Sequence, residues 1–100
     1  MKMVLIVFHA EYDDAMRDLF ERLKLPGFTE VHQVFGTGDA GRRFGTHTFP
    51  GHDTMVFSVL SGGEAGRAVQ AVKAFKASMD ARHKRPGGVK LFVLPVEEMA

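Results

Sequence analysis

The stretch Met3-Val4-Leu5-Ile6-Val7-Phe8 is an uninterrupted apolar run rich in β-branched side chains. A run of this kind is typical of a strand at the centre of a sheet, paired along both edges. It is too short to cross a membrane or to form the apolar region of a signal peptide, and His9 and the acidic Glu11 follow it closely. We therefore predict that residues 3–8 form a central strand.

Two segments have the spacing of amphipathic helices. In residues 12–23 the apolar side chains recur every three or four positions, with acidic residues before them and basic residues after them, as the helix dipole favours. The pair Pro26-Gly27 ends this segment. Residues 65–79 carry a second apolar face, formed by Ala68, Val69, Val72, Phe75 and Met79. Both helices are expected to pack on a sheet.

Three further segments, residues 29–35, 53–60 and 89–96, have the composition of strands and are flanked by glycine or proline. Between the first two, residues 36–51 hold five glycines, Pro50 and the pair Arg42-Arg43. This composition favours a mobile loop over regular structure, and a loop of this length usually has a function.

The resulting order βαββαβ predicts one α+β domain of the ferredoxin-like type over residues 1–100, with two helices on one face of an antiparallel sheet of order 4-1-3-2. In this arrangement the ends of the first two strands and the beginnings of the last two share one end of the sheet. Four of the five histidines are expected there: His9, His47, His52 and His83. His32, in the second predicted strand, is expected to face solvent. The sequence thus predicts a functional site at this end of the sheet.

The composition excludes several classes of partner. Lys and Arg number 13 against 12 for Asp and Glu, so the balance of charge does not favour a nucleic acid or an anionic membrane. The chain contains no cysteine, which excludes disulfides and thiolate chemistry and suits a reducing compartment. We expect a cytoplasmic protein that neither binds nucleic acid nor inserts into a membrane.

Two passages resemble the PII and PII-like signalling family. Residues 86–98, PGGVKLFVLPVEE, are similar to the family's glycine-rich B-loop and the apolar strand after it, although Val89 separates Gly88 from Lys90. Residues 27–36, which begin GFTEV, are similar to the passage that leads into the flexible T-loop, and Gly38 also fits that passage. The resemblance extends more loosely over the whole chain.

This resemblance implies a homotrimer that binds adenine nucleotides or other small effectors in clefts between subunits. It also implies that residues 36–51 contact a target protein such as a transporter or an enzyme. Glycine N–H groups beside a basic side chain form a suitable cradle for an anion. The residues expected to bind a nucleotide-like anion are Arg42, Arg43, Gly87, Gly88 and Lys90. Residues 36–51 lack the tyrosine that is modified in the nitrogen regulators, which argues against ATP control of nitrogen uptake.

A divalent transition metal is a second candidate ligand. His9, His47, His52 and Asp53 would offer the imidazole and carboxylate ligands that Zn, Ni, Co or Cu prefers. Their spacing matches no known metal motif, and the alternative is that the histidines are ordinary loop residues and Asp53 ends a turn. Some PII-like proteins, and the trimeric CutA proteins of similar fold, are associated with metal ions. A CutA-like metal-binding protein is therefore an alternative function.

A small enzyme is the alternative from a different class. The sequence contains no G-x-S-x-G, H-E-x-x-H or Walker motif. Ferredoxin-like monooxygenases and isomerases, however, rely on a single histidine base, for which His9 or His52 would serve. Such an enzyme is expected to have an apolar cavity between the helices and the sheet. Because glycines and charges gather at the end of the sheet instead, we predict a regulatory protein and not an enzyme.

Overall fold

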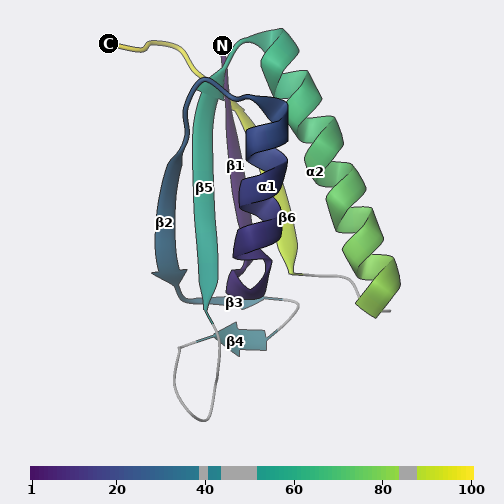
Figure 1. Ribbon diagram of the computed structural model, residues 1–100. Coiled ribbons are helices and arrows are strands. Elements are labelled where there is room, and N and C mark those ends of the chain that lie inside the picture. Colours follow the sequence, from purple (N-terminus) through teal and green to yellow (C-terminus); the bar gives the residue numbers. More distant parts are fainter. Residues whose placement is uncertain (39–40, 44–51, 84–87) are drawn as a thin grey trace.

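A two-layer α+β fold is seen in the computed structural model, which describes residues 1–38, 41–43, 52–83 and 88–100 (Figure 1). The main sheet contains β1 (Lys2–His9), β2 (Thr29–Val34), β5 (Asp53–Leu60) and β6 (Val89–Pro95). Its order is β2-β5-β1-β6 and all neighbours are antiparallel. Helices α1 (Asp13–Leu23) and α2 (Gly62–His83) lie on one face of this sheet. The predicted ferredoxin-like fold and the order 4-1-3-2 are confirmed.

The core lies between the helices and the sheet. Strands β1 and β5 bury every second side chain because successive residues of a strand point to opposite faces. The strand residues of this core are Val4, Ile6, Phe8, Val56, Leu60 and Val89, and the helices add Met16, Leu19, Phe20, Ala65, Ala68 and Val72. The apolar side of each predicted helix thus faces the sheet.

Helix α2 starts three residues earlier than its apolar pattern predicts. The Ser61 hydroxyl accepts a hydrogen bond of 3.2 Å from the Glu64 N–H, and a Glu64 carboxylate oxygen accepts one of 3.2 Å from the Ser61 N–H. This reciprocal pair is a capping box, which satisfies two of the N–H groups left free at the start of a helix. The helix can therefore begin at Gly62 in spite of two consecutive glycines.

The segment predicted as a loop contains regular structure in its first part. Strands β3 (Gly36–Gly38) and β4 (Gly41–Arg43) form a separate antiparallel pair in which Thr37 lies opposite Arg42. The prediction of a loop is therefore wrong for these six residues. Pairing of their backbone groups outweighs the low strand propensity of glycine, because propensity is a weak guide beside pairing. Residues 44–51 lie outside the described part of the chain.

The second face of the sheet carries apolar side chains that no helix of the described residues covers. We call this surface the open face; it is formed by Met3, Leu5, Val7, Val31, Met55, Phe57, Val59, Phe92 and Leu94, which alternate with the core residues. Phe92 is 49% exposed and Leu94 is 42% exposed. Neither α1 nor α2, as far as the described residues extend, is long and apolar enough to span a membrane.

Candidate functional site

Three segments meet at the end of the sheet where the sequence predicted a site. His9, the last residue of β1, lies opposite Asp53, the first residue of β5. The His9 N–H donates a hydrogen bond of 2.9 Å to the Gly88 carbonyl, just before β6, and the Ala10 N–H donates one of 3.0 Å to the His52 carbonyl. Four of the predicted site residues, His9, His52, Asp53 and Gly88, are thus brought together.

The backbone at Gly88 requires glycine for two reasons. Its φ is +91°, a conformation that side chains with a Cβ rarely adopt. A Cβ placed there would also lie 3.3 Å from Tyr12 Cε2 and 3.4 Å from His9 Cε1. The turn into β6 therefore packs directly against two rings, and its geometry depends on them.

The structure describes the other predicted anion ligands to different extents. Lys90 is exposed on β6 and pairs with Val7 of the open face. Arg42 and Arg43 belong to β4, where their backbone, but not their side chains, is described. Gly87 lies outside the described residues. Val89, which interrupts the family's pattern, is 1% exposed and belongs to the core.

The predicted metal ligands are only partly described. His9 and Asp53 are adjacent in the sheet, and a carboxylate oxygen of Glu11 lies 3.3 Å from His9 Nδ1. Within the described segments no group of three or more histidine, aspartate or glutamate side chains is arranged to hold a metal ion. His47 lies outside those segments, so the four-residue metal site remains a prediction.

A polar network that the sequence analysis missed lies near the same end of the sheet. His32 Nε2 is 3.1 Å from a Glu30 carboxylate oxygen, and His32 Nδ1 is 3.7 Å from Asp13 Oδ2. The Thr54 hydroxyl donates a 2.7 Å hydrogen bond to Asp13 and lies 3.5 Å from His32 Nδ1. His32 is exposed as predicted, with 45% of its side chain accessible, and its ring also lies near two carboxylates.

A β-bulge interrupts β2 next to this network. The pairing of β2 with β5 passes from Val31 opposite Met55 to Val34 opposite Asp53, so β2 contains one extra residue. Gln33, within this step, has a φ of +59°. Bulges redirect side chains and bend strands. Here the bulge immediately precedes the β3–β4 pair, and no simple alternation in the sequence would reveal it.

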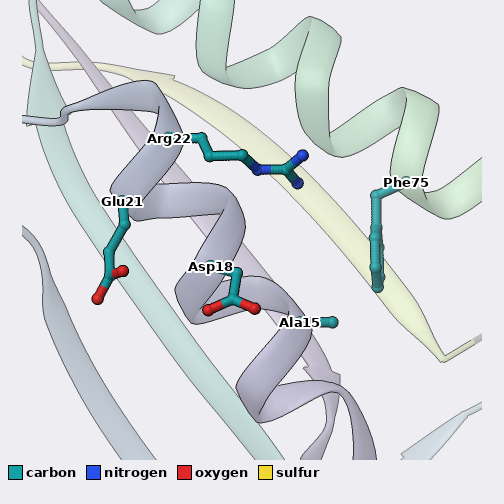
Figure 2. A pocket seen from close by; sticks show the side chains of 5 residues that line it. All are labelled: Ala15, Asp18, Glu21, Arg22 and Phe75. Carbon is teal, nitrogen blue, oxygen red and sulfur yellow. The ribbon is translucent and has the colours of Figure 1, made fainter.

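The described surface groove does not match the enzyme alternative. A groove of about 610 Å³ is lined by Ala15, Asp18, Glu21 and Arg22 of α1 and Phe75 of α2. Figure 2 shows these side chains on the two helices. Three of these five residues are charged, and neither His9 nor His52 lines the groove. A histidine-based enzyme was expected to place one of them at the mouth of an apolar cavity, and this groove does not do so.

Comparison with known proteins identifies the family. The family model for nitrogen regulatory protein P-II matches residues 1–100, so this chain belongs to that family. Proteins of the family are regulatory. No curated protein sequence matches the chain.

Solved structures support the same fold. The chain is similar to CPII, a nitrogen regulatory PII-like protein from Thiomonas intermedia K12 bound to ADP, AMP and bicarbonate, with a TM-score of 0.67, 18% identity, and coverage of 97% of this chain and 88% of CPII. It is also similar to a PII-like signalling protein from Thermus thermophilus, with a TM-score of 0.61, 18% identity, and coverage of 92% of this chain and 82% of that protein. At these identities the likeness concerns the fold.

Proposed function

We propose that this protein is an oligomeric PII-like sensor that binds a small nucleotide-like anion and signals through residues 36–51. The observation that carries the proposal is the meeting of β1, β5 and β6 at the end of the sheet where Gly88, His9 and His52 lie. Strand β2 leads from the neighbouring bulge into the β3–β4 pair at residues 36–43. A ligand at this end would therefore lie near the signalling segment.

The proposed anion ligands are the backbone at Gly87 and Gly88 and the side chains of Lys90, Arg42 and Arg43. A turn with a positive φ can direct successive N–H groups toward an anion. Lys90 is exposed on β6, so its ammonium group can reach an anion. The adenine nucleotides bound to CPII support this ligand class.

The open face supports an oligomer, which we propose to be a homotrimer. Its apolar side chains lie on two central strands and both edge strands. A continuous apolar surface of this kind on a folded chain marks a protein interface. In a closed oligomer, the same surface of each copy is covered by its neighbours. Clefts between the copies would then complete the ligand site.

Ligand binding would act by changing the conformation of residues 36–51, which begin with the β3–β4 pair. Fixing the backbone of one residue costs about 1–2 kcal/mol. A ligand can shift the equilibrium between two conformations of this segment only by the difference between its binding free energies for them. Several contacts are therefore needed, and Arg42 and Arg43 are the proposed ones. The ordered segment would contact a target protein.

A divalent metal ion is the second proposed ligand, with His9, His47, His52 and Asp53 as its ligands. The adjacency of His9 and Asp53 across β1 and β5 favours it. The two ligands do not exclude one another, because Lys90 and the glycines are not members of the metal set. Both are tested in one assay.

The test is isothermal titration calorimetry and thermal unfolding of metal-free protein with ATP, ADP, AMP, bicarbonate and first-row divalent ions. A ligand that binds only the folded state raises the melting temperature by mass action. We expect an adenine nucleotide to do so, and Lys90→Ala to weaken its binding at least tenfold. Lys73→Ala, on the exposed surface of α2, is the control.

Each outcome decides between the proposed ligands. If a divalent ion raises the melting temperature of Lys90→Ala but not of His52→Ala, the metal site is assigned to the histidine set. Equal binding by wild type and Lys90→Ala removes Lys90 from the site. Absence of binding by every nucleotide and every ion would overturn the sensor proposal.

A further inference from the structure

Three rings from three elements form a cluster beside Gly88. The ring of His9, at the end of β1, lies parallel to the ring of Tyr12, with 6.1 Å between centroids and an interplanar angle of 1°. Tyr12 belongs to the short helix η1 (Ala10–Tyr12) between β1 and α1. Its ring meets Phe75 of α2 edge to face, with 5.6 Å between centroids. The cluster thus runs from the helix layer to the end of the sheet.

Gly88 packs against the His9 and Tyr12 rings of this cluster. The positions that a Cβ of Gly88 would contact belong to the rings of Tyr12 and His9. The Gly88 carbonyl is held at the same time by the His9 N–H, at 2.9 Å. The turn is therefore fixed by one hydrogen bond and two ring surfaces, and both depend on the position of His9.

Tyr12 is the member of the cluster that contacts both other rings. It is only 9% exposed, and its ring contacts both His9 and Phe75, so it joins the end of β1 to α2. Parallel and edge-to-face contacts restrict the orientation of an aromatic ring, because they depend on its flat face and its edge. An aliphatic side chain of similar volume would fill the space without orienting His9.

We propose that Tyr12 is a positioning residue of the ligand site, which holds His9 and Gly88 in the geometry that presents Gly88 and Lys90 to an anion. The proposal rests on the proposed function for the identity of the ligand. The positioning of Gly88 by Tyr12 does not depend on it. Through Phe75, the same contacts link the ligand site to α2.

The first experiment needs no ligand. In labelled protein, NMR measures the scalar coupling across the hydrogen bond from the His9 N–H to the Gly88 carbonyl. We expect Tyr12→Leu to lose this coupling and Tyr12→Phe to keep it. The reference is the bond from the Ala65 N–H to the Ser61 carbonyl in α2, which should persist in both variants. Phe75→Leu, which removes the edge contact, is the second variant if Tyr12→Leu does not fold.

The second experiment measures ADP binding by the same variants. We expect Tyr12→Leu to weaken binding at least tenfold and Tyr12→Phe to bind within threefold of wild type. Retention of the His9–Gly88 coupling in Tyr12→Leu would overturn the positioning role, and so would loss of the coupling with unchanged affinity. If wild type does not bind ADP, the proposed ligand is wrong, while the coupling still decides whether Tyr12 positions Gly88.

Discussion

The hydroxyl group of Thr54 donates a 2.7 Å hydrogen bond to the carboxylate of Asp13, which joins strand β5 to the first turn of helix α1. The two residues are 41 positions apart in sequence. Thr54 is 1% exposed, so its hydroxyl has little access to water. Acidic residues in a first turn suit the helix dipole, but Asp13 also serves as an acceptor for the sheet.

Replacing Thr54 with valine should destabilise the protein. The shape of the side chain is nearly kept, but Asp13 loses its donor and the buried site loses a hydrogen bond. A bond to a charged group contributes about 1.5–3 kcal/mol, and we expect a loss of stability of this size in urea unfolding. Thr29→Val, at an exposed position of β2, is the control. A change of less than about 0.5 kcal/mol, the usual range of surface substitutions, would contradict the inferred role.

Two glycine-to-alanine changes should have opposite effects. Gly66→Ala, in the interior of α2 with open space around it, should stabilise the protein by about 0.8–1 kcal/mol because alanine favours helix. Gly88→Ala should destabilise it by about 1–3 kcal/mol because φ is positive there. Urea unfolding measures both. Stabilisation by Gly88→Ala would show that the turn is not constrained as described.

The capping box of α2 should contribute measurably to stability. Loss of a serine cap typically costs about 0.5–2 kcal/mol, and we expect this for Ser61→Ala. Because Ser61 and Glu64 bond reciprocally, a double-mutant cycle with Glu64→Ala should show coupling. Additive effects of the two changes would mean that the box does not form in solution.

The open face should control the oligomeric state. Phe92 is 49% exposed in the single chain, so Phe92→Glu should leave the fold intact and prevent association, because it would bury a charge. Light scattering should give the mass of three 11.1 kDa chains for wild type and of one chain for this variant. Ala74→Glu, exposed on α2, should remain trimeric. A monomeric wild type would exclude the trimer.

The candidate site could be predicted where it depends on element order. The meeting of His9, His52, Asp53 and Gly88 follows from the βαββαβ order, because antiparallel neighbours bring strand ends and strand beginnings together. The network of His32 could not be predicted in this way. It depends on the packing of α1 against β5, which brings Asp13 to Thr54 and has no local signature in the sequence.

The amino-acid order alone was enough to place the strands, the core faces of both helices and the order of the elements, because the apolar residues of each segment recur at the spacing of a strand or a helix. The side of β1 and β5 that is buried depends on which face the helices cover, because apolar residues occupy both sides of these strands. The β3–β4 pair forms because two glycine-rich segments come side by side. The Gly88 turn takes its shape from the rings of His9 and Tyr12, which reach it only once β1 and β6 pair. Contacts between residues far apart in sequence exist only in the folded chain, and these contacts shape the candidate site.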